Sequence, residues 1–537
     1  MNKRSIYQPI FYSLLLIVGL FLGMFLSGNK SANPFLSKKY TAYEKINDVL
    51  NYIHNSYVDT VNNDKIADEA INSLLQSLDP HSYYIAASEF NEVNDPLEGS
   101  FEGIGVEFRI IKDTIVVINT VAGGSSEEKG IKAGDRIVKV DDTIVAGVKI
   151  TNKQVMKKLK GKGGTKVKIG ILRQGFKNLI DFTVTRGKIP TYSIDIAFRP
   201  TKDIGYIKIS KFSATTAEEF SDALKNLTNK GMKKLILDLR GNGGGYLDAA
   251  ITLADEFLSK NKLIVYTEGI HKKKKDYYST SEGSFESNDL MVLVDEFSAS
   301  ASEILAGAIQ DNDRGLIIGR RSFGKGLVQE QLQLSDGSAI RLTVARYHTP
   351  SGRCIQNNYS KGVDDYYNDF YNRFIDGEME SQDSIHFADS LKYKTIKGRT
   401  VYDGGGIMPD IFIAIDKEER TILYAELINK GLIYQFAFDY SDKNRKQFMQ
   451  YKNAIGFINN YQVTDAVLDD LIKYAEKNAV KYKKEDFEKS KNLIKLQLKA
   501  YIGRNIFKDE AFYPIILSND KAFLKAIELL NSNKPLL

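Results

Sequence analysis

Three serines alternate with alanine at one point of the chain, and a serine in such a place can act as a nucleophile. An apolar, β-branched run over residues 290–294 predicts a buried strand, and residues 301–309 follow with helical spacing. A strand, a tight turn and a helix place a hydroxyl at the exposed start of the helix. Ser298, Ser300 and Ser302 all lie at this turn. Serine also caps helices, so the turn alone leaves nucleophile and cap as alternatives.

A nucleophilic serine needs a base, and Lys325 is the candidate. It lies between two glycines, after an apolar strand over residues 316–318. Partial burial there would disfavour the ammonium form, lower the pKa of the lysine and leave a usable base near neutral pH. Serine with lysine is a known variant of the catalytic triad. His81 is an alternative base, but its position directly after Pro80 favours an ordinary loop histidine.

Two glycine-rich stretches offer backbone N–H groups to an anion. Residues 240–245 follow a strand predicted over 233–239 and precede a helix predicted over 247–258, an arrangement that suits an oxyanion. Residues 103–106 (Gly-Ile-Gly-Val) precede another strand. Consecutive unpaired amides form an anion-binding nest, and the adjacent strand edge can accept an extended peptide.

Composition and spacing argue against several other classes of protein. A net charge of +6 over 537 residues is mild and does not indicate nucleic-acid binding. Cys354 is the only cysteine, which excludes an intrachain disulfide and a cysteine-based metal cluster. The histidines do not form a zinc motif, so we expect no metal and no cofactor. Residues 319–325 resemble a phosphate loop, but Gly326 occupies the position where Ser or Thr binds magnesium.

The N-terminus predicts a membrane anchor. Lys3 and Arg4 precede a mostly apolar run over residues 6–27, close to the ~20 residues that cross a bilayer. Positive charges on the N-terminal side predict a cytoplasmic N-terminus, with the catalytic part on the periplasmic or extracytoplasmic side of the cytoplasmic membrane. A cleaved signal peptide is the alternative, but the run is long for one and no clear Ala-x-Ala site follows.

Hydrophobic periodicity and composition divide the chain into regions. Residues 1–38 are predicted to be a signal anchor and linker, and residues 39–98 a helical region. Short strands with intervening turns over 99–188 predict a small β domain. Strands alternating with helices over 189–415 predict an α/β core, with a polar surface insertion at about 356–400. Residues 416–537 are helical and rich in lysine, without an interpretable motif.

These motifs together resemble the carboxyl-terminal processing (tail-specific) proteases over roughly residues 40–415. The resemblance is carried by residues 101–105, 238–245, 298–303, 323–329, 347–353 and 403–410, in family order. It implies an α/β plus β multidomain protein. A PDZ domain (99–188) would precede a ClpP/crotonase-like α/β protease core (189–415), with helical N- and C-terminal regions.

The resemblance also implies roles for individual residues. Positions 300 and 325 have the family's serine-to-lysine spacing, which selects Ser300 as nucleophile and Lys325 as base. Gln329 matches the residue that orients the lysine, and Glu303 a further polar contributor in some members. Ser298 and Ser302 keep capping or turn-supporting roles. The remaining expected contacts are oxyanion donors at Ala301 and Gly244, and peptide-carboxylate binding by Gly103, Ile104, Gly105 and Val106.

The implied function is a serine endopeptidase that cleaves exported proteins and recognises unstructured C-terminal tails through its PDZ domain. Its partners would be substrates with free C-termini, with the membrane contacted by the N-terminal helix. The alternative is a catalytically inactive PDZ scaffold, which the joint presence of Ser300, Lys325 and Gln329 disfavours. The helical tail leaves homo-oligomer and adaptor binding open.

Overall fold

The computed structural model describes residues 4–27 and 41–532, in two compact units divided between Ser73 and Leu74. The first unit holds α1 (Arg4–Ser27), α2 (Ala42–Ser56) and most of α3 (Asn63–Gln76). Over the described residues, no helix is long and apolar enough to cross a membrane. The predicted span, residues 6–27, lies partly outside the residues whose side chains are described.

The second unit is built on a mainly parallel sheet with strand order β10-β11-β12-β15-β16-β21. Its strands are rich in aliphatic residues because both faces are covered. Along β12, Leu235 and Leu237 pack into one buried cluster and Ile236 into another. The strands are β10 (Ile194–Phe198), β11 (Ile204–Ile209), β12 (Lys234–Asp238), β15 (Asp289–Val294), β16 (Leu316–Gly319) and β21 (Ile411–Phe412).

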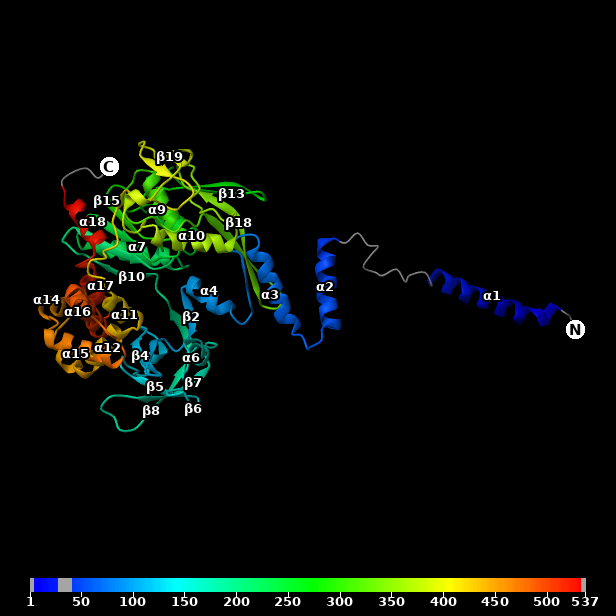
Figure 1. Ribbon diagram of the computed structural model, residues 1–537, viewed down its shortest axis with the longest axis horizontal. Coiled ribbons are helices and arrows are strands. Elements are labelled where there is room, and N and C mark those ends of the chain that lie inside the picture. Colours follow the sequence, from blue (N-terminus) through cyan, green and yellow to red (C-terminus); the bar gives the residue numbers. More distant parts are fainter. Residues whose placement is uncertain (1–3, 28–40, 533–537) are drawn as a thin grey trace. The chain divides into compact units, whose positions relative to one another are not determined.

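Helices cover both faces of this sheet (Figure 1). One face packs against α7 (Thr216–Asn229), α8 (Leu247–Asp255) and α9 (Ala301–Asp311). The other packs against α17 (Asp509–Leu517) and α18 (Lys521–Asn531), which end the described chain. The C-terminal helices therefore complete the core of the α/β domain.

A second, antiparallel sheet flanks the site. Its central strand, β18 (Ala339–His348), pairs with strands from distant parts of the chain. They are β1 (Tyr83–Ile85), β13 (Leu263–Gly269) and β17 (Leu327–Gln333), and β14 (Lys272–Tyr278) extends the sheet beyond β13. Because β1 precedes β18 by about 250 residues, this sheet brings the segment before residue 86 to the segment after residue 326.

The small β domain follows α4 (Phe90–Glu98). β2 (Ser100–Gly103) and β9 (Gly187–Pro190) lie at its two ends and pair with each other, so the chain enters and leaves the domain at the same place. Its interior is aliphatic, with Ile115, Ile137 and Ile169 fully buried. The elements between are β3 (Val106–Ile111), β4 (Thr114–Thr120), α5 (Ser125–Glu128), β5 (Arg136–Val140), β6 (Thr143–Ile144), α6 (Asn152–Leu159), β7 (Lys166–Leu172) and β8 (Ile180–Thr185).

The segment predicted as a polar surface insertion (356–400) is more ordered than its weak periodicity indicated. It contains α10 (Val363–Ile375), the short helices η1 (Gln382–Ser384) and η2 (Asp389–Leu391), and β19 (Lys392–Lys394), which pairs with β20 (Thr400–Tyr402). α10 buries Tyr366 and Arg373 against the core. The insertion therefore contributes to the interior as well as to the surface.

The C-terminal region folds around its own hydrophobic cluster. Leu468, Leu471 and Leu498 are fully buried there. The helices are α11 (Ile422–Asn429), α12 (Leu432–Lys443), α13 (Arg445–Phe448), α14 (Ala454–Asn460), α15 (Asp465–Lys477) and α16 (Lys484–Phe507). Tyr434 and Phe438 of α12 also pack on Val116 of the small β domain. The region thus contacts the β domain through α12 and the α/β core through α18.

Candidate active site

Ser300 lies at the sharp turn between β15 and α9, in a strained backbone conformation. Its φ is 55° and its ψ is −113°, outside the regions that L-residues favour. Such strain costs about 1–3 kcal/mol and persists only where the surroundings impose it. The residue is the N-cap of α9 and half-buried. A serine presented this way corresponds to the strained strand-to-helix turn of nucleophilic serines.

The neighbouring serines hold this turn against the glycine loop. The Ser298 hydroxyl donates to the backbone oxygen of Leu239 at 2.9 Å, and the Ser302 hydroxyl donates to that of Asn242 at 2.9 Å. Asp295 accepts from the N–H of Gly241 at 2.9 Å. The hydroxyls of Ser298 and Ser302 therefore both stabilise the turn.

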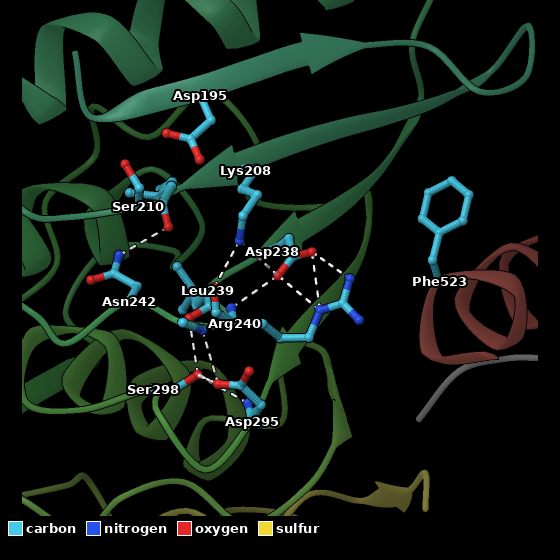
Figure 2. A network of polar contacts seen from close by, with 12 residues as sticks. Asp195, Lys208, Ser210, Asp238, Leu239, Arg240, Asn242, Asp295, Ser298 and Phe523 are labelled. Carbon is cyan, nitrogen blue, oxygen red and sulfur yellow. Dashed lines mark hydrogen bonds and ion pairs between the residues drawn. The ribbon is translucent and has the colours of Figure 1, made fainter. Parts of the chain in front are cut away.

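The glycine loop (residues 240–245) is fixed at its base by charges, as Figure 2 shows. The guanidinium of Arg240 pairs with Asp238 at 2.6 Å, and Lys208 donates to the Arg240 carbonyl at 2.7 Å. These partners hold the pKa of the Asp238 carboxyl below its usual range, although burial alone would raise it. Asn242 donates to the Ile209 carbonyl at 3.0 Å, which ties the loop to β11.

Gly244 lies against the serine, but its N–H is not available in this structure. That N–H donates to the side-chain oxygen of Asn242 at 2.8 Å, and it would have to leave Asn242 to act as the predicted oxyanion donor. A Cβ at Gly244 would lie 2.8 Å from Cβ of Ser300 and 2.9 Å from the nitrogen of Ala301. Ala301 and Gly245 carry N–H groups without a hydrogen-bond partner among the described residues.

Lys325 and Ser300 line the same cavity of about 630 Å³. The Lys325 ammonium donates to Oε1 of Gln329 at 2.9 Å. Burial lowers the pKa of Lys325, and the positive charge of Arg341, which also lines the cavity, lowers it further. The carboxylates of Asp79 and Glu303 act in the opposite direction. The lowered pKa favours the neutral amine that a general base requires.

Glu303 joins the serine turn to the lysine loop. Its buried carboxylate accepts from the N–H of Ser300 at 2.8 Å and from the N–H of Lys325 at 2.9 Å. It also accepts from the N–H of Gly324 at 2.7 Å and from the hydroxyl of Ser322 at 2.5 Å. Burial raises the pKa of Glu303, and these donors oppose that rise. One side chain therefore fixes the backbones on both sides of the proposed dyad.

Other residues of the site were not identified from the sequence. The buried hydroxyl of Tyr347 donates to the backbone oxygens of Lys325 at 2.8 Å and Ser300 at 3.2 Å. Asn242 connects the glycine loop to both β11 and the serine turn. Both lie inside motifs that carried the family resemblance. Their place inside these motifs is the one signal that could have identified them, because their spacing along the chain does not indicate a role.

A second cavity, of about 290 Å³, lies at the loop expected to bind a peptide carboxylate. Ile104, Gly105 and Val106 line it, and Gly103 belongs to β2, where it pairs with Gly187 of β9. Much of the remaining lining is apolar and comes from Phe101, Phe108, Met156 and Leu159. Asp95 of α4 contributes to both this cavity and the one at Ser300, so α4 is a wall shared by the two.

Comparison with known proteins places these features in a wider context. Family models match at residues 203–367 (peptidase family S41), 103–184 (PDZ domain) and 423–508 (a family of unknown function). The chain is 35% identical over 366 residues to the carboxy-terminal processing protease CtpA of Bacillus subtilis, covering 67% of this chain and 76% of that protein. It is 35% identical over 331 residues to CtpB of the same organism, covering 61% and 68%. A solved structure, the photosystem II D1 C-terminal processing protease, is 26% identical with a TM-score of 0.36 and covers 70% of this chain and 87% of its own.

Proposed function

The chain belongs to the carboxy-terminal processing proteases of peptidase family S41, and from that premise we propose that Ser300 and Lys325 form its catalytic dyad. The family is of the serine type, so a nucleophile and a base are required. The observation that carries the assignment is that both side chains line one cavity while Glu303 binds both of their backbones.

The proposed reaction runs through an acyl-enzyme. The neutral amine of Lys325 takes the proton of the Ser300 hydroxyl as its oxygen attacks a peptide carbonyl. The resulting ammonium returns that proton to the leaving amine when the C–N bond breaks. The same amine then takes a proton from water, and the resulting hydroxide attacks the ester carbonyl. As the ester C–O bond breaks, the ammonium returns that proton to the Ser300 oxygen, and the fragment with the new carboxyl terminus leaves. Gln329 keeps the lysine directed at the serine through its Oε1.

Two backbone N–H groups are proposed to stabilise the oxyanion. The first belongs to Ala301, at the positive end of α9. The second belongs to the glycine loop: the Gly245 N–H has no hydrogen-bond partner in the part of the chain that the structure describes, whereas that of Gly244 would have to leave Asn242. Removal of one such donor typically reduces kcat by ~10²–10³.

We further propose that the PDZ domain captures the free, unstructured C-terminus of exported substrates. The apolar cavity beside Ile104, Gly105 and Val106 supports this, because it combines backbone amides with apolar lining. The proposed location is the cytoplasmic membrane, with the catalytic part on its outer side. Its support is the sequence of residues 3–27, two positive charges followed by an apolar run.

One experiment tests the catalytic assignment. The full chain, purified in detergent, would be incubated with an unfolded protein that ends in an apolar C-terminal residue. We expect cleavage by the parent and loss of at least ~10³-fold in kcat with Ser300→Ala or Lys325→Ala. Normal cleavage by either variant would show that the dyad is misassigned, and an inactive parent would favour a peptide-binding scaffold.

The membrane location has its own test. Cells that express the full chain would be fractionated, and intact spheroplasts treated with an external protease. We expect the protein in the membrane fraction and its catalytic part to be digested from outside. Recovery in the soluble fraction, or complete protection, would contradict the proposed anchor.

A further inference from the structure

A loop before β1 contacts the side chain that orients the lysine. Its residues are Asp79, Pro80, His81 and Ser82. The Asp79 carboxylate accepts from the N–H of His81 and the N–H of Ser82, both at 2.8 Å, and from the Ser82 hydroxyl at 2.6 Å. The N–H of Thr343 on β18 donates to the Ser82 hydroxyl at 3.0 Å. The loop is thus fixed internally and attached to the central strand of the second sheet.

The backbone carbonyl of His81 determines which way the Gln329 amide faces. It accepts from Nε2 of Gln329 at 2.5 Å, while Oε1 of the same amide accepts from Lys325. A carbonyl oxygen can only accept a hydrogen bond, so it binds the NH₂ end of the amide and leaves the oxygen for the lysine. The reversed amide would direct an N–H at the amine and occupy the lone pair that must receive the proton from Ser300.

The His81 ring has a structural role, because it packs against other aromatic side chains. Its Nε2 lies 3.0 Å from the hydroxyl of Tyr366, and it meets the rings of Tyr366 and Phe323 edge-on, at centroid distances of 5.3 and 6.4 Å. Burial, helped by the charge of Lys325, lowers the pKa of His81 to about 4, so the ring is neutral near pH 7. No hydrogen bond joins it to Ser300 among the described residues.

Tyr366 belongs to α10, whose other contacts also reach the lysine loop. The ring of Phe370 lies 5.1 Å from that of Phe323, two residues before Lys325. Arg373 donates to the backbone oxygens of Arg321 at 2.9 Å and Ser322 at 3.1 Å. Tyr366 itself is only 3% exposed. One face of α10 therefore packs on residues 321–323, just before Lys325.

We propose that His81 and Tyr366 are positioning residues of the proteolytic reaction. Tyr366 fixes the ring of His81, the His81 carbonyl fixes the amide of Gln329, and Gln329 keeps the lone pair of Lys325 free for the serine. This inference rests on the proposed Ser300–Lys325 dyad. It assigns a role in catalysis to the loop before β1 and to the insertion that contains α10.

The inference predicts a distinct kinetic signature for Tyr366→Phe. Loss of the Tyr366 hydroxyl loosens His81 and, through it, the Gln329 amide. We expect kcat to fall by roughly tenfold, less than the 10²-fold cost of a displaced catalytic group, and KM to stay within about twofold. The hydrogen bond to Gln329 favours the ammonium form of Lys325. Weakening this hydrogen bond lowers the pKa of Lys325, so the rise of kcat with pH moves to lower pH. A variant that was merely less stable would keep the midpoint of that rise.

The test is a double-mutant cycle in the full chain. Tyr366→Phe, Gln329→Ala and the double variant would be assayed across pH, with Tyr371→Phe as control because Tyr371 lies on the same helix with 65% of its surface exposed. If Tyr366 acts through Gln329, the double variant is no slower than Gln329→Ala alone. His81→Phe, which keeps a ring and the carbonyl, should match Tyr366→Phe.

Three outcomes separate the inference from its premise. Equal losses from Tyr366→Phe in both backgrounds would show that Tyr366 acts independently of Gln329 and would overturn the positioning role. Normal kinetics for both Tyr366→Phe and His81→Phe would overturn it as well, while leaving the dyad intact. Cleavage that survives Lys325→Ala would overturn the dyad itself, and the positioning role with it.

Discussion

At the scale of single residues, Gly244 shows how closely backbone approaches the nucleophile. Gly244→Ala should reduce kcat by about 10² or more, because the new methyl group would lie under 3 Å from Ser300 and Ala301, and because φ is 101° there. Gly243→Ala is the matched control, since nothing lies within 4 Å of its Cβ position. Comparable kcat values for the two variants would contradict the observed packing.

Arg341 provides a second test at this scale, in the opposite pH direction to Tyr366→Phe. Its guanidinium donates to Tyr83 and Gln331 at 2.7 Å, and its charge lowers the pKa of Lys325. In Arg341→Gln that pKa rises, so the increase of kcat with pH moves to higher pH while the plateau is retained. Arg346→Gln, on the same strand and exposed, should leave the profile in place. A midpoint that stays fixed, or falls, in Arg341→Gln would refute this account.

At the scale of elements, the strand–turn–helix from β15 to α9 carries a cost in stability. Ser300→Gly and Ser300→Ala both lose the hydroxyl, but only glycine relieves a φ of 55°. We expect the glycine variant to have a free energy of unfolding higher by ~1 kcal/mol, the lower end of the strain range. Chemical denaturation of the two inactive variants measures the difference. Equal stability would mean that the turn is not strained.

The sequence predicted this element well because its signals are local. The aliphatic run, the turn and the helical spacing all lie within residues 290–309, and the two residues of the proposed dyad are separated by a fixed distance along the chain. The PDZ fold and the α/β core, both confirmed, follow from equally local patterns. The proposed role of α10 could not be predicted from the sequence. It depends on contacts of the buried Tyr366 and Arg373 with His81 and Ser322, which are distant along the chain.

Asn242 is a further example of what local patterns omit. Its side chain donates to β11 and accepts from Gly244, while its carbonyl accepts from Ser302. Three adjacent glycines after the asparagine indicated only that backbone approaches something closely. Which N–H of the loop has a partner depends on the Asn242 side chain, so the Gly244 oxyanion donor stays a prediction.

At the scale of the whole molecule, α17 and α18 of the C-terminal region are part of the protease core. Phe523 of α18 is buried, and its ring meets that of Tyr206 on β11 at 5.5 Å. Phe523→Ala should lower the free energy of unfolding by about 3–5 kcal/mol through the cavity that it leaves. Leu524→Ala, at the next position and 45% exposed, should change it by no more than about 0.5 kcal/mol.

Denaturant unfolding of the two variants measures this difference. A small effect of Phe523→Ala would mean that α18 is dispensable for the core. The same helix also reaches the glycine loop, because Asp520 at its N-cap pairs with Arg240 at 2.7 Å. Both Asp520 and α18 lie after residues 423–508, the region matched to a family of unknown function.

The attachment of the Asp79–Ser82 loop to β18 has a consequence for biosynthesis. A ribosome completes residue 82 long before it reaches Gln329 and Tyr366, and contacts between such distant segments form late. Until residue 366 has been made, the amide next to the lysine lacks its full support. The proposed positioning contacts are therefore complete only after α10 has been synthesised, so the site reaches its full arrangement late in biosynthesis.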